Sequence, residues 1–503
     1  MSPQTVAEKT GYRATSTHAE VMRFIDELKQ LESPLLRVSS FGQTPQGREL
    51  PLLILSSAGV ADPAAARALG RPVVLLQNCI HAGEVEGKEA ALMLVRDLLG
   101  GLDAGLLEKL TLLVVPIFNP DGNDAMDTAN RALQIERLMG QDGPPRVGTR
   151  VNAAGINLNR DYIRHESAEM RLLQTRICQP WQPDVTVDSH ATNGSVHRFA
   201  MTYDIPHTVE SGRKEPIDFM RHTLLPEISA AVRSGFGLDS GWYGNFVEDE
   251  QALDSKGVAD PAASVREGWL TYPHHPRFGS NYRGLTNRLD LLLECYSYLT
   301  FEERVRTTYA WLLETLRAVG RRAEEIRTLV DQSQQPPSRI AVSYRVEAME
   351  EPIDILTRLP RTRSGEPHTV RIPFLARFVG QAVVQRPRAY ALPAQLKPFL
   401  VGHGLRIEAA PRHGTVEAAC FEGSSHLGGR AILEAAGVRQ CQVSWRKESR
   451  QLASDCILLP TDQPLGALAV YLCEPESDDG LVENGLLPTP AQGQEFAVLR
   501  ILD

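Results

Sequence analysis

Residues 73–99 read VVLLQNCIHAGEVEGKEAALMLVRDLL, which predicts a buried strand followed by an amphipathic helix. The first half is a continuous apolar run of strand length, and the second half places apolar side chains at helical spacing. His81 and Glu84 lie in the turn between them. Because catalytic groups of α/β folds lie on loops at the carboxyl ends of strands, this turn is a candidate functional site.

The same alternation of strands and helices extends over the first two thirds of the chain. Helical patterns such as Glu215–Arg233 and Phe301–Val330 separate apolar runs of strand length. The further strands that we predict here are ELPLLILSS, LTLLVVPIFN, PDVTVDSH and RLDLLLECYS. This order indicates an α/β layer architecture with a largely parallel or mixed sheet.

The last third of the chain has a different character. A polar segment with two prolines, VDQSQQPPSRIAVSY, is predicted to be a linker. After it come short strands with turn signals and few helices, namely HTVRIPFLARFVGQAVVQ, GTVEAACF, RQCQVSWR and DCILLPT. We therefore predict an α/β domain over residues 1–335 and a smaller β-rich domain over residues 336–503.

The composition excludes several functional classes. The 503 residues are 42% hydrophobic and 23% charged, which is typical of a soluble globular protein. A net charge of −9 without a basic run argues against nucleic-acid binding, and no apolar stretch approaches the roughly 20 residues that span a membrane. The start lacks the pattern of a signal peptide, and seven cysteines without a C-x-x-C pair indicate reduced thiols. We expect a cytoplasmic protein.

His81 and Glu84 are residue types that bind zinc. A catalytic zinc site takes three protein ligands and leaves one position open for water. His190, 109 residues after His81 and at the end of another predicted strand, is the natural third ligand. Either histidine taken alone is more often a surface or capping residue, but the pairing at two strand ends favours a metal site.

Glu294 interrupts the apolar run LLLEC. An unpaired buried charge costs several kcal/mol, so this carboxylate needs an explanation. One is a structural ion pair, for example with Arg288. The other is a general base whose pKa is raised by its apolar neighbours. The strand alone does not decide between them.

A third polar cluster, GTRVNAAGINLNRDY, covers residues 148–162. Arg150, Asn159 and Arg160 offer planar donors that suit carboxylates and oxyanions. The simpler interpretation is that these side chains cap and cover a turn.

Together these segments resemble the zinc carboxypeptidase family, which contains pancreatic carboxypeptidase A and the regulatory carboxypeptidases. The order of motifs matches over roughly residues 15–330: GQTPQGREL, HAGE, NPDG, GTRVNAAGINLNRDY, DSH and a late Glu at a strand end. The Asn-Arg loop is most similar to the regulatory type. The resemblance implies a three-layer domain with a mixed central sheet, to which this chain adds its β-rich C-terminal region.

The resemblance also implies roles for individual residues. His81, Glu84 and His190 would bind one zinc ion per chain, and Glu294 would be the general base and acid. The other roles are oxyanion stabilisation by Arg150, a grip on the substrate's terminal carboxylate by Asn159 and Arg160, and a mobile tyrosine over the substrate, for which we favour Tyr282 over Tyr272. The implied reaction is hydrolysis of a C-terminal peptide or peptide-like amide bond by a metal-activated water.

Two residues depart from the family pattern. Asn157 replaces an Asp that orients the first zinc histidine, and an amide oxygen makes that ligand less basic than a carboxylate would. Asp161 replaces an amide residue that commonly follows the Arg. Neither change removes a ligand.

Two other functions stay open. One is a zinc amidohydrolase of the same fold, which deacylates N-acyl amino acids or cuts peptidoglycan peptides; the other is a pseudoenzyme that only binds. The NLNR motif favours a peptide or N-acyl amino acid with a free carboxylate. The C-terminal domain could shape access to the site, mediate homo-oligomerisation or bind a partner. Because every candidate catalytic residue precedes about residue 330, we do not expect it to be needed for the chemical step.

Overall fold

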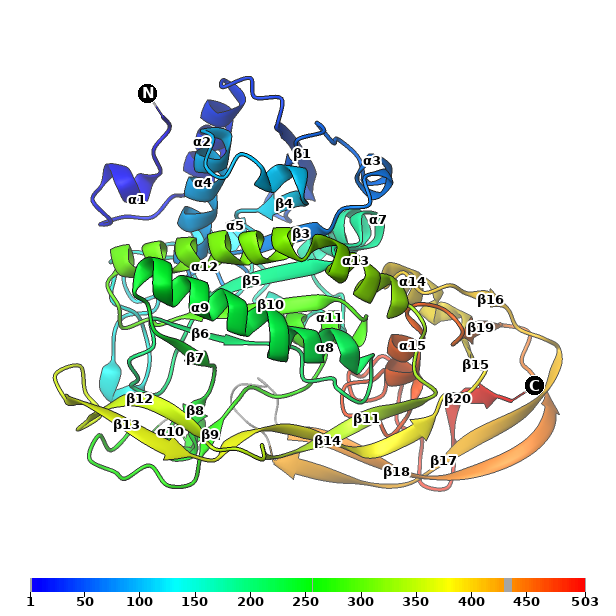
Figure 1. Cartoon of the computed structure of the whole chain (residues 1–503). Coiled ribbons are helices and arrows are strands. Elements are labelled where there is room, and N and C mark those ends of the chain that lie inside the picture. The colour runs from blue at the N-terminus through cyan, green and yellow to red at the C-terminus, as the bar shows by residue number, and fades with distance from the viewer. Residues whose placement is uncertain (1, 256, 429–436, 503) are drawn as a thin grey trace.

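The computed structural model describes residues 2–255, 257–428 and 437–502 of the chain. A mixed sheet of eight strands lies at its centre, in the order β1-β2-β4-β3-β5-β10-β6-β7 (Figure 1). The strands β4, β3, β5 and β10 run parallel to one another, whereas β1, β2 and β6 introduce antiparallel pairs. The bounds are β1 Leu36–Gln43, β2 Glu49–Leu55, β3 Val73–Asn78, β4 Thr111–Val115, β5 Val185–Ala191, β6 Met201–Asp204, β7 Ser240–Trp242 and β10 Leu289–Cys295. The α/β prediction with a mixed sheet is confirmed.

Helices cover one face of this sheet. Strand side chains alternate between faces, so Val74 and Leu76 of β3 point into this core, whereas Val73 and Leu75 point into the core on the other side. Both cores are apolar, which explains why the central strands are continuous apolar runs. The covering helices are α2 (His18–Lys29), α4 (Glu86–Leu99), α9 (Leu225–Phe236), α12 (Phe301–Arg321) and α13 (Ala323–Gln332) (Figure 1).

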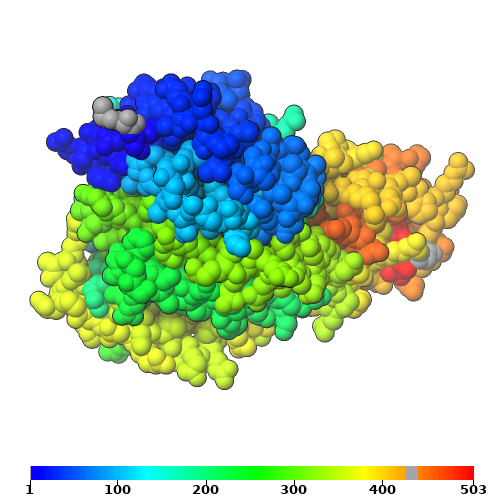
Figure 2. All heavy atoms as spheres, turned by 45° about the horizontal axis from the view of Figure 1, so that its top comes forward, coloured from blue at the N-terminus to red at the C-terminus, as the bar shows by residue number. Residues whose placement is uncertain are grey.

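Short helices and the C-terminal region cover the other face. The apolar core there joins residues of the sheet, such as Leu75 and Leu113, to residues far along the chain, such as Tyr390 and Leu472. Figure 2 shows the orange C-terminal residues lying directly against the blue N-terminal ones on the face in view. The short helices on this side include α6 (Ala168–Leu172), α7 (Gln179–Trp181), α11 (Gly279–Leu285) and α14 (Lys397–Gly402).

The C-terminal region is rich in β-strands, as predicted. A six-stranded sheet has the order β16-β19-β15-β20-β17-β18, and β12 pairs with β13 in a hairpin. The fully buried helix α15 (Gly466–Cys473) lies against β11. The bounds are β11 Arg339–Ala348, β12 Ile353–Leu359, β13 Glu366–Ile372, β14 Phe374–Gln385, β15 Ala389–Pro393, β16 Glu408–Ala409, β17 His413–Gly428, β18 Gly437–Gln451, β19 Cys456–Pro460 and β20 Glu495–Ile501.

One sheet crosses the predicted linker. Its four strands have the order β11-β14-β9-β8, and β8 (Asn245–Phe246) and β9 (Trp269–Leu270) belong to the first part of the chain. The segment near residue 335 therefore marks a change in composition, but backbone pairing and a shared apolar core join the two sides. Among the described residues, no helix is both long and apolar enough to cross a membrane.

Candidate active site

The register of the central strands brings the candidate residues together. In the parallel pair β5–β10, Glu294 lies directly beside His190, and in the pair β3–β5, Asn78 lies beside Ser189. The turn that follows β3 therefore leaves the sheet at the edge where β5 carries His190. The sequence places the polar residues at the carboxyl ends of these strands, and the parallel pairing gathers them at one edge.

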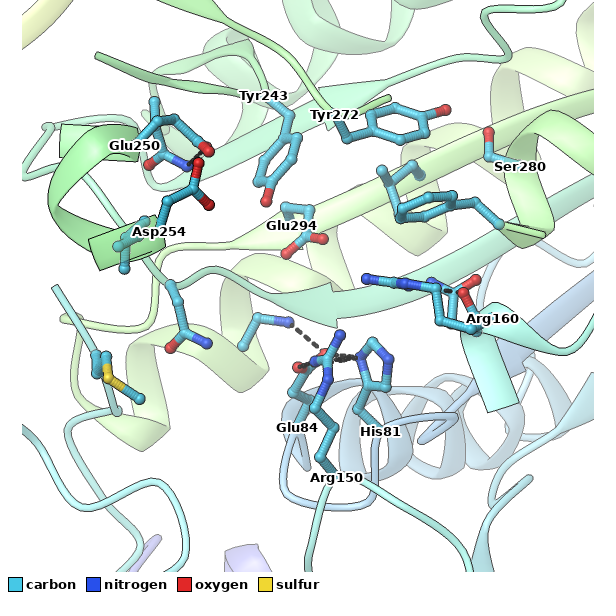
Figure 3. Close-up of a pocket in the computed structure, with 18 of the residues that line it drawn as sticks. His81, Glu84, Arg150, Arg160, Tyr243, Glu250, Asp254, Tyr272, Ser280 and Glu294 are labelled. Carbon is cyan, nitrogen blue, oxygen red and sulfur yellow. Dashed lines mark hydrogen bonds and ion pairs between the residues drawn. The ribbon is translucent and has the colours of Figure 1, made fainter. Parts of the chain in front are cut away.

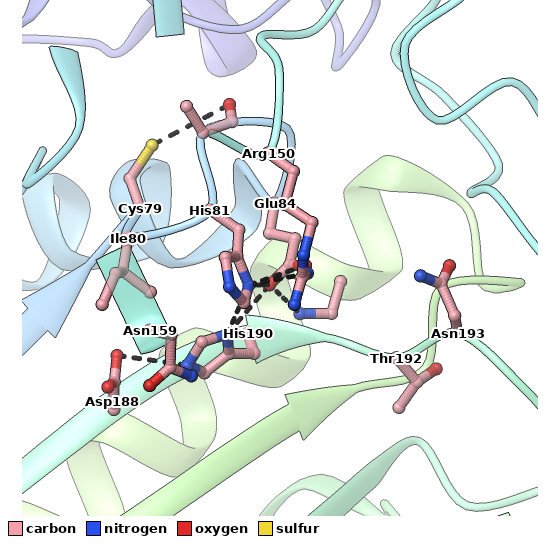
Figure 4. A network of polar contacts seen from close by, with 12 residues as sticks. Cys79, Ile80, His81, Glu84, Arg150, Asn159, Asp188, His190, Thr192 and Asn193 are labelled. Atoms are coloured by element: carbon pink, nitrogen blue, oxygen red, sulfur yellow. Dashed lines mark hydrogen bonds and ion pairs between the residues drawn. The ribbon is translucent and has the colours of Figure 1, made fainter. Parts of the chain in front are cut away.

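Three potential ligands meet at this edge. His81 Nδ1 lies 3.2 Å from His190 Nδ1 (Figure 4). The carboxylate of Glu84 faces both rings, at 3.1 Å from His81 Nδ1 and 3.0 Å from His190 Nδ1. All three side chains are almost fully buried.

The spacing of these atoms fits a zinc ion. Tetrahedral ligands bound at about 2.0–2.1 Å lie about 3.3 Å from one another, close to the separations found here. Two imidazoles and one carboxylate are also the donor set of a catalytic zinc site, which keeps a fourth position open. One potential ligand atom from each of His81, Glu84 and His190 lies within 4.8 Å of the other two, so the residues present fit the metal.

Each histidine is oriented by its second ring nitrogen. His81 Nε2 lies 3.1 Å from Asn157 Oδ1, and His190 Nε2 lies 3.3 Å from Asp188 Oδ1. The backbone N–H of Asn159 also donates to Asn157 Oδ1, which fixes the amide with its oxygen toward the ring. Asn157 thus takes the orienting role that an Asp has in the family pattern. The orienting carboxylate, that of Asp188, lies beside the other histidine, His190.

Asp161, the other departure from the family pattern, faces away from the ligands. Its carboxylate accepts hydrogen bonds from the backbone N–H groups of Glu166 and Ser167 and from the Ser167 hydroxyl. Burial raises the pKa of this carboxyl group, against the effect of those hydrogen bonds. Asp161 therefore holds the backbone that follows the Asn-Arg pair.

Two arginines stabilise the charge of Glu84. Arg131 Nη1 lies 3.0 Å from Glu84 Oε1, and Arg150 Nη1 lies 3.4 Å from the same oxygen. Burial alone would raise the pKa of Glu84, but the charges of His81 and Arg131 and the histidine hydrogen bonds hold it well below its usual range. The sequence analysis missed Arg131, because the segment TANRALQ that carries it has no recognisable pattern.

Glu294 lies across the cavity from the ligands. Its carboxylate points into the space between Tyr243 and the pair His81 and Glu84 (Figure 3). Burial raises the pKa of Glu294 to about 8, although the charges of His190 and Arg150 act against it. A carboxyl group with a raised pKa suits proton transfer near neutral pH.

The structural ion pair that we considered for Glu294 is not formed. Arg288 lies 3.7 Å from Asp184 instead. The neighbouring Arg283 is also structural, since its guanidinium binds Asp290 at 2.8 Å and Gln77 at 2.9 Å in the buried layer beneath the site.

His81, Glu84 and Glu294 line a cavity of about 510 Å³. Arg160 also lines it, with its guanidinium 3.9 Å above the ring of Phe278. Asn159 accepts a 2.9 Å hydrogen bond from the backbone N–H of Gly279. The remaining wall residues include Arg150, Asp188, Asn193, Tyr243, Asn245, Glu250, Asp254, Tyr272, Ser280 and Leu292.

Comparisons with known proteins agree with this site. Residues 21–191 match the family model described as zinc carboxypeptidase, which spans His81, Glu84 and His190. Over these residues the chain is similar to the zinc carboxypeptidase family.

Several relatives bear carboxypeptidase names. The chain is 22% identical over 485 residues to carboxypeptidase 2 of Trichophyton tonsurans, covering 91% of this chain and 81% of that protein. It is 31% identical over 142 residues to carboxypeptidase D of Mus musculus, which covers 25% of this chain and 10% of that one. A metallo-carboxypeptidase structure from Burkholderia cenocepacia matches with a TM-score of 0.41 and 19% identity, over 61% of this chain and 69% of that one. The similarity to these relatives supports a zinc metallocarboxypeptidase-like hydrolase, with peptide hydrolysis as its general activity.

The tyrosine expected over the substrate of a carboxypeptidase is not Tyr282. Its hydroxyl lies 2.7 Å from His403 Nδ1, and it lines a separate cavity. That prediction is corrected for a physical reason: the glycine-containing segment that carries it forms the buried helix α11 rather than an open loop.

Two other tyrosines line the carboxypeptidase cavity. The hydroxyl of Tyr272 donates to the carbonyl oxygen of Ile205 at 2.9 Å, so only its ring faces the cavity. The hydroxyl of Tyr243 points toward Glu294 (Figure 3). Burial, followed by the charge of Glu294, raises the pKa of Tyr243. The sequence analysis missed Tyr243, and the only available signal was a pair of glycines, Gly241 and Gly244, close on either side.

Proposed function

We propose that the protein hydrolyses the C-terminal peptide bond of peptides and releases the terminal amino acid. The observation that carries this proposal is the position of Arg160 in the same cavity as His81, Glu84 and Glu294. A guanidinium held there can bind the terminal carboxylate of a peptide while the scissile bond lies near the ligand cluster.

A zinc ion at this site would supply the electrophile. Zinc held by His81, Glu84 and His190 would polarise the scissile carbonyl and lower the pKa of a water molecule. Asn157 and Asp188 keep both histidine rings turned so that their Nδ1 atoms face the same point. Arg131 keeps Glu84 charged, as a ligand must be.

The chain's own residues move the proton. Glu294 would take a proton from the attacking water and pass it to the nitrogen of the leaving amino acid. Arg150, whose guanidinium lies beside His81 and Glu84, would donate to the carbonyl oxygen as negative charge develops there. The side chain of Arg150 is 37% exposed, so it can reach into the cavity.

The test compares a free-acid peptide with the same peptide carrying a C-terminal amide. A hydrogen bond to a charged group contributes roughly 1.5–3 kcal/mol, so amidation should lower kcat/KM by about tenfold to several hundredfold. Arg160→Ala should lower activity on the free acid by a similar factor and discriminate far less against the amide. The decrease in the ratio of kcat/KM for the free acid to kcat/KM for the amide measures the coupling between the guanidinium and the carboxylate.

Equal discrimination by wild type and Arg160→Ala would show that Arg160 does not hold the carboxylate. An N-acyl amino acid also presents a carboxylate to Arg160, so the same panel should include N-acyl amino acids of several acyl sizes. Faster cleavage of small N-acyl amino acids than of any peptide would favour the deacylase function over the carboxypeptidase function.

A further inference from the structure

The segment between β9 and α11, residues 271–278, joins the active site to the C-terminal region. It carries Tyr272 and Phe278, which line the cavity, and between them lie two residues that point the other way. His274 and Arg277 bind two consecutive carboxylates, Asp478 and Asp479, which follow helix α15.

The contact of Arg277 with Asp479 is buried, and it engages both oxygens of the carboxylate, one through the guanidinium and one through the backbone N–H. Arg277 Nη2 and Nε lie 2.7 and 2.9 Å from Asp479 Oδ1, and the backbone N–H of Arg277 donates to Oδ2 at 2.7 Å. The Asp479 side chain is 0% exposed and that of Arg277 is 9% exposed. Asn484 Nδ2 donates a further 3.0 Å hydrogen bond to Oδ1. Water therefore has little access to substitute for any lost partner.

The neighbouring contact, between His274 and Asp478, strengthens the same attachment of residues 271–278 to the C-terminal region. His274 Nε2 lies 2.7 Å from Asp478 Oδ2, and Tyr471 donates to Asp478 Oδ1 at 2.6 Å. The ligand atoms of His274, His275 and Asp478 are close enough to hold a metal. However, both oxygens of Asp478 already accept short hydrogen bonds from protein groups, so we interpret this cluster as part of the attachment.

The attachment ends next to the residue that grips the substrate. Phe278 directly follows Arg277, and its ring lies 3.9 Å beneath the Arg160 guanidinium. The next residue, Gly279, donates its backbone N–H to Asn159 Oδ1. Asp479 therefore holds the backbone at Arg277, and the two residues that follow, Phe278 and Gly279, contact the Asn-Arg pair.

We propose that Asp479 of the C-terminal region is a positioning residue for substrate binding, acting through Arg277 and Phe278 on Arg160. This inference rests on the proposed carboxypeptidase function and assigns the C-terminal region a part in it. A guanidinium that must meet a carboxylate in a bidentate geometry tolerates little displacement, so loosening the Phe278 platform weakens recognition of the carboxylate.

The variant Asp479→Asn keeps the shape of the side chain and removes its charge. In the full-length zinc enzyme we expect KM for free-acid peptides to rise on the order of tenfold, with kcat changed much less. Activity on the amidated peptide should stay near the wild-type value, because that substrate has no carboxylate to position. Zinc content should be unchanged.

Tyr344→Phe provides a matched control at the same interface. The Tyr344 hydroxyl contacts Ser211 Oγ at 2.5 Å and accepts from the backbone N–H of Glu210, and none of these residues lines the cavity. The Tyr344 ring packs against His274 of the segment, with centroids 4.8 Å apart, and phenylalanine keeps that ring, so this variant removes only the buried hydroxyl contact between the two regions. It should keep the wild-type preference for free acids even if its thermal stability falls.

Two further measurements keep the proposal falsifiable if Asp479→Asn folds poorly. Arg277→Lys retains a positive charge opposite Asp479 but loses the paired contact of two guanidinium nitrogens with Asp479 Oδ1, and it should show an intermediate preference. Calorimetric binding of an N-acetyl amino acid and of its amide to the zinc-free protein reports carboxylate recognition without turnover. Wild type should bind the free acid more tightly, and Arg277→Lys should reduce that difference.

The outcomes separate the two proposals. A wild-type enzyme with no preference for free acids would overturn the carboxypeptidase function and this inference with it. A wild-type preference that survives unchanged in folded Asp479→Asn and Arg277→Lys would overturn the inference alone. An equal loss of preference in Tyr344→Phe would also overturn it, since any weakening of the interface would then suffice.

Discussion

Glu294 differs from the other carboxylates of the cavity because burial holds its pKa at about 8 and Arg288 pairs elsewhere. We expect Glu294→Gln to keep the fold and the metal and to lower kcat by about 10²- to 10⁴-fold, because an amide cannot accept the proton of water. Steady-state kinetics, metal analysis and circular dichroism of the variant test this. A loss of folded protein would show a structural role, and near-normal turnover would place the base elsewhere.

The ligand assignment has its own test at the same scale. We expect about one zinc per chain in the wild type and almost none in the double variant His81→Ala/His190→Ala, because Glu84 alone offers a single carboxylate. Elemental analysis after dialysis against a weak chelator measures this. Stoichiometric zinc in the folded double variant would refute the assignment, and Tyr344→Phe, far from the ligands, serves as the control for handling losses.

The sequence predicted the candidate zinc ligands and the general base better than it predicted the side chains that surround them. His81, Glu84, His190 and Glu294 were predictable because each interrupts an apolar strand or follows its end. Arg131 and Tyr243 were not, since they lie in segments without periodicity and come to Glu84 and to the cavity, respectively, only through the folded path of the chain. The sequence also predicts that the amide oxygen of Asn157 can accept a hydrogen bond from the imidazole of His81, and the contact between these two groups agrees with this.

At the scale of elements, the central strands follow directly from their residues. The strands β3, β5 and β10 are apolar throughout, as strands covered on both faces must be, and their parallel register aligns the polar residues at one edge. Helix α11 shows where this reasoning fails. Its sequence GSNYRGL has two glycines and a polar composition typical of a loop, yet all seven residues are buried. Tertiary contacts, such as the bond from Tyr282 to His403, override that local signal.

The loop between β5 and β6 gives a prediction about acid stability. His197 in this loop packs against Tyr296, with ring centroids 4.1 Å apart, and burial lowers its pKa to about 3 from an ordinary 6.5. The folded chain thus holds this imidazole neutral, whereas the unfolded chain protonates it below about pH 6.5. The stabilisation is therefore complete above pH 6.5 and is lost as pH falls from 6.5 toward 3.

At pH 5 this single residue should lower the free energy of unfolding by about 2 kcal/mol relative to pH 7, since one pKa unit corresponds to about 1.36 kcal/mol. His197→Phe keeps an aromatic ring at the site and removes the titrating group. Urea unfolding at pH 7 and pH 5 should show a smaller loss in the variant than in wild type. Equal pH dependence in both proteins would mean that His197 is solvated or paired in the folded state.

At the scale of the whole molecule, the change of composition near residue 335 does not coincide with a break in packing. The apolar core on the site's side of the sheet contains Leu75 and Tyr162 from before that point and Tyr390 and Leu472 from after it. The β11-β14-β9-β8 sheet also crosses it. Composition identified the β-rich character of the region, but composition carries no information about which surfaces meet.

This shared core changes our expectation for a chain that ends at Gln335. The sequence alone predicts that such a fragment retains zinc and does not need the C-terminal region for the chemical step, provided that the interface it exposes does not make it aggregate, because every candidate catalytic residue lies within it. The structure shows that the fragment would expose the apolar face that Tyr390 and Leu472 cover and would lose the Asp479 contact to Arg277. Exposed apolar patches of this kind cause aggregation.

We therefore expect residues 1–335 alone to be largely insoluble or to elute as large aggregates in size-exclusion chromatography. Co-expression with residues 336–503 as a separate chain should recover soluble protein, because the contacts that join the two parts are non-covalent and buried on both sides. The recovered complex should also bind zinc and prefer free-acid peptides. A soluble, monomeric fragment 1–335 with full zinc content and an undiminished preference for free acids would contradict both the shared core and the positioning role of Asp479.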